Sequence, residues 1–251
     1  MLDEAGVTLP PGKQSLVAGR LMKRLRHYGL NNFNDYLLLI DGRGNESERQ
    51  QTIDLLTTHE TYFFREDAHF NFLREQVSTS FAKKPLRIWS AACSTGQEPY
   101  SISMILSELG NVVSSWDLLA SDISESSLDE AKRGIYSDKQ MSSLPREYLK
   151  KYCLKGVRSQ EGKYTVNKVL RNKIEFKKIN LNENLSKTGR FDFIFLRNVM
   201  IYFDIETKQK IIRNLIRQLN PGGYLLIGHS ETLNGISNNI AFVRPSIYRL
   251  E

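Results

Sequence analysis

From Pro85 onward the chain alternates short apolar segments with amphipathic ones, and this alternation limits the fold more than any other feature. Segment 191–196, FDFIFL, is apolar almost throughout, as is typical of a central strand buried on both faces. Alternating strand and helix periods predict an α/β domain with a parallel, doubly wound sheet. Strands are expected at 86–90, 116–121, 173–179, 191–196, 224–228 and 242–250, helices at 98–109, 125–133 and 205–219, and a turn at 221–223.

Residues 1–75 lack this alternation and show the spacing of amphipathic helices. Helices are expected at 13–25, 34–40, 46–56 and 67–77. The first has an apolar stripe of Leu16, Val17, Leu21 and Leu25, and a basic face of Lys13, Arg20, Lys23, Arg24 and Arg26. The sequence therefore predicts an all-helical domain over 1–75 and an α/β domain over 76–251.

One stretch, at about 145–172, interrupts the strand–helix alternation because it is polar and basic. Within it, 163–166 (KYTV) has the composition of a strand and follows a predicted turn at 159–162. We expect a small antiparallel β-subdomain here, inserted outside the main sheet.

Composition narrows the setting of the protein. No stretch approaches the length needed to span a bilayer, and the N-terminal MLDEAGVTLPPGK lacks the features of a signal peptide, so a cytoplasmic location is expected. Cys93 and Cys153 have neither CxxC nor Cys/His spacing, which disfavours a disulfide or a zinc site. The net charge of +7 favours an acidic partner: nucleic acid, an anionic membrane or an acidic protein surface.

The ends of the first two predicted strands suggest a nucleoside site. The segment after the first strand, SAACSTGQE, holds one glycine, Gly96, and so does not match the GxGxxG fingerprint of pyrophosphate binding. The second strand ends at Asp122, which has the right position to accept both hydroxyls of a ribose. A ribose site without a phosphate loop favours S-adenosylmethionine over NAD. A tight turn at Gly96 and a helix N-cap at Asp122 are the structural alternatives.

The fourth predicted strand is followed by RNVMIYFD, residues 197–204. Arg197, Asn198 and Tyr202 stand where the sheet opens toward a ligand. The segment lacks the Asn/Asp-Pro-Pro-aromatic motif of adenine N-methyltransferases, which counts against a base-modifying enzyme. Asp204 is expected to cap the following helix.

These motifs together resemble the chemotaxis receptor glutamate methyltransferase family. The matching stretches are TTHETYFFRE (57–66), RIWSAACSTGQEPYSISM (87–104), FDFIFLRNVMIYFD (191–204) and LNPGGYLLIGHSETL (219–233), supported by LVAGRLMKRLR (16–26) and ASDISESSLDEAKRGIY (120–136). The resemblance implies a class I, Rossmann-like S-adenosylmethionine methyltransferase fold, with the helical domain and inserted β-subdomain already expected. It implies no metal. It also implies cofactor contacts at Thr61, Arg65, Glu98, Asp122, Asn180, Leu181, Arg197 and Asn198, and at His59, where the family usually has Asn.

The implied reaction places few demands on catalytic groups. A glutamate carboxylate is ionised near neutral pH, so it needs no general base before it attacks the methyl group of the cofactor. Catalysis would come mainly from positioning that carboxylate. The resemblance assigns this task to Arg65 and Tyr202, while Phe63 and Phe64 are expected in the core or the pocket wall.

Partners follow from the same resemblance. The basic face of helix 13–25 either docks on the acidic helical bundle of a receptor's cytoplasmic domain or is merely solvated. The β-subdomain is the candidate for binding a receptor's C-terminal peptide by strand addition, although Val157 and Arg158 stand where small residues would favour it. We expect no nucleic acid, no membrane insertion, and a monomer. The alternatives are a methyltransferase for a small acid or RNA and a signalling module without turnover.

Overall fold

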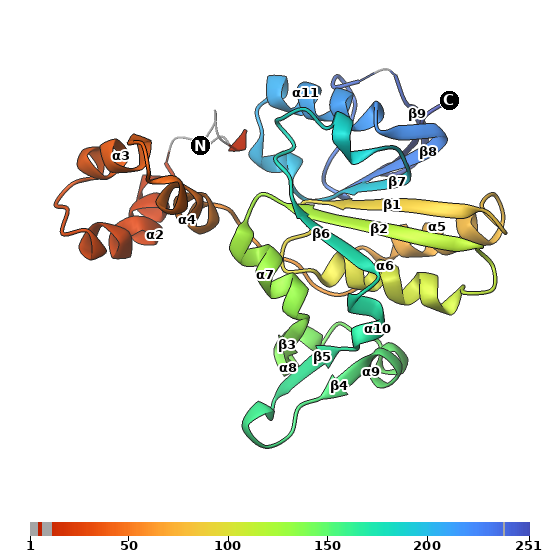
Figure 1. Cartoon of the computed structure of the whole chain (residues 1–251). Helices are drawn as coiled ribbons and strands as arrows, with labels where there is room; N and C mark the ends of the chain where they lie inside the picture. The colour runs from red at the N-terminus through yellow and green to blue at the C-terminus, as the bar shows by residue number, and fades with distance from the viewer. Residues whose placement is uncertain (1–4, 7–11, 238) are drawn as a thin grey trace.

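The computed structural model describes residues 5–6, 12–237 and 239–251 (Figure 1). Its N-terminal part is a helical domain beside one end of the α/β domain. The helices are α2 (Gln14–His27), α3 (Phe33–Asp41) and α4 (Glu46–Leu56). They share a separate core of Leu21, Leu25, Tyr36, Ile40 and Leu56. The predicted helical domain is therefore present, with α2, α3 and α4 around a core of their own.

A buried polar cluster holds these three helices together. Glu48 accepts two hydrogen bonds from the Arg24 guanidinium, at 2.8 and 2.5 Å, and one from the Tyr36 hydroxyl at 2.6 Å. Arg20 donates to the C-terminal carbonyl groups of α4, including Thr57 at 3.0 Å. Two members of the predicted basic face thus have structural partners. Lys23 and Arg26 remain exposed on α2.

The main sheet has seven strands in the order β6-β2-β1-β7-β8-β10-β9. The five strands from β6 to β8 are parallel, and β10 and β9 each run antiparallel to the neighbour before them. The doubly wound α/β prediction is confirmed. The bounds are β1 (Pro85–Ala91), β2 (Ser115–Asp122), β6 (Ile174–Lys178), β7 (Phe191–Leu196), β8 (Leu219–Ile227), β9 (Ala241–Arg244) and β10 (Ile247–Arg249).

Helices cover both faces of this sheet because successive strand residues point to opposite sides. Ile88 and Phe193 lie in one core with α5 (Asp67–Ser78), α6 (Gln97–Glu108) and α7 (Glu125–Arg133). Their neighbours Trp89 and Ile194 lie in a second core with α11 (Ile205–Ile216), on the upper face in Figure 1. Since Phe70, Phe72, Leu73 and Val77 of α5 belong to the first core, the structure groups α5 with the α/β domain, ahead of the boundary expected at residue 75.

The C-terminal part of the sheet differs from the prediction in two ways. The segment Pro221–Gly223, expected as a turn, lies inside β8, where the pairing with β7 shifts register. The single strand expected at 242–250 is a hairpin of β9 and β10, with Ser246 at φ 59° in the turn. A strand cannot continue through that left-handed residue, which explains the break.

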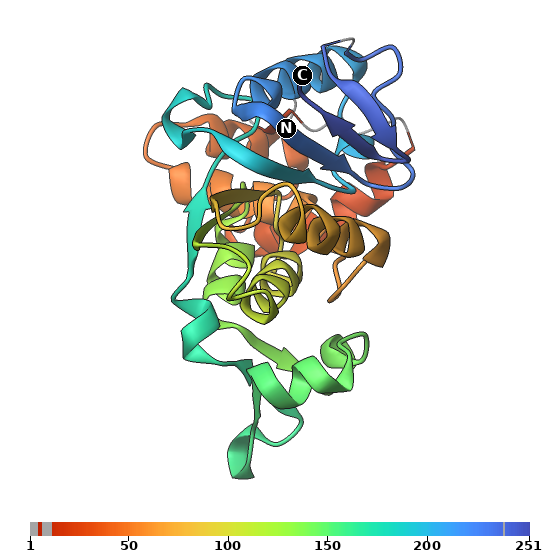
Figure 2. The same cartoon turned by 90° about the vertical axis from the view of Figure 1, so that its right-hand side faces the viewer.

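The predicted β-subdomain is present and projects from the main body below α7 in both views (Figures 1 and 2). Its three-stranded antiparallel sheet has the order β3-β5-β4. Strand β3 (Ile135–Ser137) lies ahead of the range 145–172 expected from composition, so the subdomain starts earlier than predicted. The other elements are α8 (Asp138–Met141), α9 (Arg146–Tyr152), β4 (Cys153–Lys155), η1 (Arg158–Gln160), β5 (Lys163–Val166) and α10 (Lys168–Arg171).

Within the part of the chain that the structure describes, no helix is both long and apolar enough to cross a bilayer. Cys93 and Cys153 are free thiols, and burial raises the pKa of each.

Candidate functional site

The sheet has its switch point between β1 and β7. From β1 the chain continues to β2 on one side, whereas from β7 it continues to β8 on the other. Ligands of doubly wound sheets bind at such a point, beyond the carboxyl ends of the strands. A cavity of about 340 Å³ lies there, lined by the segments that follow β1, β2, β6 and β7.

The cavity brings together every site residue that the sequence analysis selected. They are His59, Thr61, Arg65, Glu98, Asp122, Asn180, Leu181, Arg197, Asn198 and Tyr202. The helical domain also contributes to the wall through Lys13, Leu16, Arg20 and Leu56. Residues from both domains therefore surround one space.

Asp122 is fixed at the end of β2 by backbone N–H groups. Its Oδ2 accepts from the N–H of Ser94 at 2.8 Å and its Oδ1 from that of Ser124 at 2.9 Å. Burial raises the pKa of Asp122, although these hydrogen bonds favour the ionised form. Ser124, not Asp122, caps α7 by accepting from the N–H of Ser127. The remaining lone pairs of Asp122 can accept hydrogen bonds from a ligand.

Gly96 begins α6 in the left-handed region, at φ 96°. A Cβ atom here would lie 2.8 Å from Cβ of Ala131 on α7. Only glycine allows this backbone conformation together with so close an approach. The structural explanation of Gly96, a tight turn, therefore suffices.

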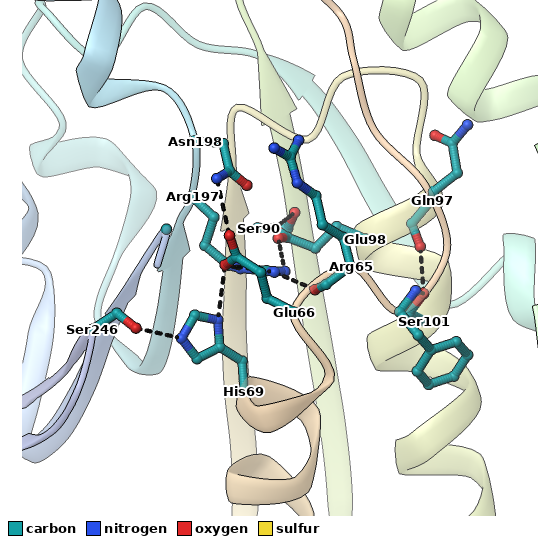
Figure 3. A network of polar contacts seen from close by, with 12 residues as sticks. Arg65, Glu66, His69, Ser90, Gln97, Glu98, Ser101, Arg197, Asn198 and Ser246 are labelled. Atoms are coloured by element: carbon teal, nitrogen blue, oxygen red, sulfur yellow. Dashed lines mark hydrogen bonds and ion pairs between the residues drawn. The ribbon is translucent and has the colours of Figure 1, made fainter. Parts of the chain in front are cut away.

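Arg197 lies at the centre of a polar network (Figure 3). Its guanidinium donates to Glu98 Oε2 at 2.8 Å, to Glu66 Oε2 at 3.0 Å and to the carbonyl group of Arg65. Glu98 also accepts from the hydroxyl of Ser90 at 2.7 Å. Because Arg197 is buried, two carboxylates compensate its charge, and the network fixes the backbone at Arg65.

Glu66 was not identified from the sequence, although it completes this network. It stands at φ 57° just before α5, and its Oε1 accepts from Nδ2 of Asn198 at 3.1 Å and from the N–H of His229 at 3.2 Å. Burial alone would raise its pKa, but the hydrogen bond from Asn198, the charge of Arg197 and further bonds outweigh burial and lower it. Glu66 is thus an ionised anchor for Asn198.

Glu66, His69 and His229 also lie close enough to suggest a metal site. His69 is fully buried, and its Nδ1 lies 3.6 Å from Glu66 Oε2 without a hydrogen-bond partner. However, the same Oε2 accepts from Arg197, so a metal cation would have to compete with a guanidinium. Burial and the charge of Arg197 lower the pKa of His69 to about 3. The trio is explained as part of the Arg197 network.

Glu231 is a second residue that the sequence analysis missed. Its Oε2 accepts from the N–H groups of Gly228 at 2.7 Å and Asn198 at 3.0 Å, and its Oε1 accepts from that of Met200 at 2.8 Å. Asn198 has a φ of 56°, which is uncommon for a residue with a side chain. One carboxylate therefore holds the loop between β7 and η3 (Met200–Tyr202) in a strained shape.

Arg65 and Tyr202 face the cavity from opposite parts of the chain. Arg65 donates to the carbonyl group of Glu60 at 2.8 Å, and its guanidinium lies 5.6 Å from the ring centre of Tyr62. Tyr202 ends η3, and Asp204 caps α11 by accepting from the N–H of Thr207 at 2.8 Å, as predicted. Both side chains are partly exposed, so a group entering from solvent can reach them.

Comparison with known proteins shows which family has this architecture. Residues 59–248 match the model described as "CheR methyltransferase, SAM binding domain", and residues 1–57 match "CheR methyltransferase, all-alpha domain". The chain belongs to the CheR methyltransferase family. As in that family, an all-helical domain precedes a domain that binds S-adenosylmethionine. In this CheR-family chain, the match to the SAM-binding domain begins at His59 and includes β1 to β9.

Curated relatives of this CheR-family chain carry the name chemotaxis protein methyltransferase. The protein of Salmonella typhimurium is 39% identical over 250 residues, which cover 99% of this chain and 86% of the relative. That of Escherichia coli is 39% identical and covers 99% and 87%, respectively. That of Borreliella burgdorferi is 38% identical over 255 residues and covers 97% and 89%.

Proposed function

We propose that this protein transfers the methyl group of S-adenosylmethionine to glutamate side chains of chemotaxis receptors in the cytoplasm, giving glutamate methyl esters. One observation carries the proposal. All the residues expected to hold the cofactor or to orient a carboxylate line the same cavity at the switch point of the sheet. The membership in the CheR family gives the reaction class.

The cavity suits S-adenosylmethionine in its donor set. Asp122, with lone pairs left over from its backbone contacts, is the acceptor for the ribose hydroxyls. Apolar side chains of Ile123, Ile179 and Leu181 provide a wall for the adenine ring. Glu98 matches the ammonium group of the amino-acid part, and Arg65 can offer its forked donors either to the carboxylate of that part or to the carboxylate of the substrate. Thr61, Asn180, Arg197 and Asn198 complete the set.

The cofactor, when bound, supplies a methyl group on a sulfonium. The glutamate carboxylate that accepts it is already ionised, so the protein needs no general base. Attack neutralises both charges, and strong stabilisation of the separate ions would slow the reaction. The useful contribution is therefore orientation, to which Arg65 contributes through its forked donors and Tyr202 through a single hydroxyl.

The substrate must approach past the helical domain. Lys13, Leu16 and Arg20 line the cavity, so a receptor helix that presents its glutamate to Tyr202 would lie across the start of α2. Exposed Lys23 and Arg26 extend a positive surface along that helix. This arrangement supports docking of the helical cytoplasmic domain of a receptor on α2.

The β-subdomain supports a second contact with the receptor. Residues 145–173 hold nine Lys or Arg and two Asp or Glu, a net charge of +7, which equals that of the whole chain. Strand β4 is at the edge of its sheet, with Leu154 66% exposed, and Val157 beyond it is 72% exposed. An open edge with positive charge suits an extended acidic peptide, such as a receptor C-terminus, bound by strand addition. A monomer suffices for both contacts.

Labelled methyl transfer tests this proposal. The protein is incubated with methyl-labelled S-adenosylmethionine and receptor-containing membranes of its own cell, and the product is treated with mild alkali. We expect label to be released as methanol, because carboxyl esters are hydrolysed under these conditions. Replacing Arg65 by Ala or Tyr202 by Phe should reduce the initial rate by about 10²-fold if positioning is the main contribution.

Other outcomes would contradict the proposal. Label that resists alkali would indicate N- or C-methylation, and transfer to RNA or a small acid would indicate another substrate class. Binding of the cofactor without any transfer would indicate a signalling module. The Glu130→Gln variant is the matched control, because Glu130 is exposed on α7, does not line the cavity and lies outside both proposed receptor contacts.

A further inference from the structure

The imidazole of His59 joins the helical domain to the α/β domain. Its Nε2 lies 3.1 Å from the carbonyl oxygen of Asp54 and 2.9 Å from Oγ1 of Thr57, both at the C-terminal end of α4. Its Nδ1 lies 3.0 Å from Oγ of Ser127, in the first turn of α7. One ring thus contacts an element of each domain.

These partners determine the tautomer of His59. A carbonyl oxygen only accepts hydrogen bonds, so Nε2 carries the proton and donates to Asp54. The hydroxyl of Thr57 already donates to the carbonyl group of Ile53 and can accept from the same proton. Nδ1 is left as the acceptor for the hydroxyl of Ser127. Both ring nitrogens therefore have partners within the protein, and neither remains for a ligand.

The backbone of His59 extends this connection into the cavity. Its carbonyl oxygen accepts from the hydroxyl of Ser94 at 3.1 Å, and the N–H of Ser94 donates to Asp122 at 2.8 Å. Thr61 and Arg65 follow in the same segment. The position of His59 thus sets three parts of the cavity wall: the segment that leads to Arg65, the loop after β1 and, through Ser94, Asp122.

Two further hydrogen bonds cross the same seam between α4 and α7. Nε2 of Gln50 donates to the carbonyl group of Ile123 at 2.9 Å, and the N–H of Ser126 donates to Asp54 at 3.1 Å. Of the residues in this seam, His59 bonds to both helices and also lines the cavity. It therefore has the central place in the seam.

We infer that His59 is a positioning residue, which clamps α4 to α7 and thereby shapes the cofactor cavity without using its ring to bind the cofactor. This inference replaces the expectation of a direct contact from the ring of His59. It rests on the proposed cofactor site.

Ser127 provides the decisive test because it bonds to His59 but does not line the cavity. Binding of S-adenosylmethionine is measured by calorimetry for the full-length protein, His59→Ala, Ser127→Ala and the double variant. Each single change should weaken binding by about three- to tenfold, as expected when one buried hydrogen bond is lost. The double variant should bind no more weakly than His59→Ala, because both changes remove the same bond.

Ser126→Ala is the matched control, since Ser126 lies on the same turn of α7 but its side chain is exposed and does not contact His59. It should bind the cofactor like the parent. Weakened binding by His59→Ala together with unchanged binding by Ser127→Ala would show a direct cofactor contact and overturn the inference. Lower melting temperatures with unchanged affinities would also overturn it, by showing a purely structural role. A parent protein that binds no S-adenosylmethionine would instead overturn the proposed function, and this inference with it.

Discussion

A single carboxylate, that of Glu231, holds the loop that carries Asn198 and leads to Tyr202. We predict that Glu231→Gln destabilises the protein although it hardly changes side-chain volume. Gln has one acceptor oxygen, and its amide N–H groups would face the backbone N–H of Met200 or those of Gly228 and Asn198. A buried donor left without an acceptor costs about 1–3 kcal/mol.

Urea unfolding measures this loss of stability. The rate of methyl transfer at saturating cofactor tests whether Tyr202 still orients the substrate. The free energy of unfolding should fall by about 1–3 kcal/mol, and the rate should fall with it. Glu130→Gln again serves as the exposed control. An unchanged free energy of unfolding in Glu231→Gln would show that water or a backbone shift compensates for the lost acceptor.

Residue identity predicted the candidate site only in part. The ten selected residues stand after strand ends or in motifs, and all of them line the cavity. Glu66 and Glu231 also stand in the quoted motifs, but their roles could not be predicted because their partners converge only after folding. Those partners are mainly the side chains of Arg197 and Asn198 for Glu66, and backbone N–H groups for Glu231. The loops that these two carboxylates hold contain Glu66 and Asn198 at positive φ. This conformation could not be predicted from the sequence, because neither position is a glycine.

The β-subdomain, as an element, offers a prediction about electrostatics. Exposed charges are screened by salt, so the KM for the receptor should rise with ionic strength while that for S-adenosylmethionine changes little. Replacing exposed Lys150 and Lys155 by Gln should raise the KM for the receptor roughly threefold or more and weaken its salt dependence. The measurement is initial methyl transfer at several salt concentrations.

A matched pair of changes on α2 shows how much of the electrostatic attraction for the receptor comes from α2 and how much from the β-subdomain. Lys23→Gln with Arg26→Gln removes the same charge from the other proposed contact. If only the α2 pair changes the KM, the β-subdomain does not attract the substrate and this prediction is wrong.

Among the elements, the parallel strands and the long helices could be predicted, because each has a run of apolar residues or a helical period. The predictions of secondary structure are wrong where the apolar run or the helical period covers only a few residues. Strand β3 has only three residues and joins β5 through a chain-distant pairing that composition does not encode. The segment Pro221–Gly223 has turn residues, yet it extends β8, where the N–H of Gly222 donates to the carbonyl group of Leu250 at 2.8 Å. Tertiary pairing outweighs local preference at these positions.

At the scale of the whole molecule, the cavity is a product of both domains. Residues 59–248, the cofactor-binding match, supply the strand ends, but Leu16, Arg20 and Leu56 close the wall from the helical domain. Through Ser94, the hydrogen bonds of His59 fix the position of that wall relative to Asp122. The proposed docking of the substrate on α2 and the proposed cofactor site would therefore depend on the same relative placement of the two domains.

The stability of the whole molecule should also depend on pH through His69. Burial and the charge of Arg197 lower its pKa to about 3, whereas in the unfolded chain it titrates near 6.5. Between these two values the unfolded state holds an extra proton, so the free energy of unfolding falls as the pH falls. At pH 5 the loss should be about 2 kcal/mol relative to neutral pH. Glu66, whose pKa is also lowered, adds its own loss only at more acidic pH.

Urea unfolding of the parent and of His69→Gln at pH 7 and pH 5 separates this contribution from those of the other histidines. Gln lacks a group that titrates in this range, so the variant should be less stable at pH 7 but should lose less stability on acidification. The nearest groups, Glu66, Arg197 and His229 around Nδ1 and Ser246 at Nε2, are the same in both proteins. Equal pH dependence in the two proteins would mean that His69 takes up its proton while folded. In that case the carboxylate of Glu66, 3.6 Å from Nδ1, would outweigh burial and Arg197 in setting the charge at the base of the site.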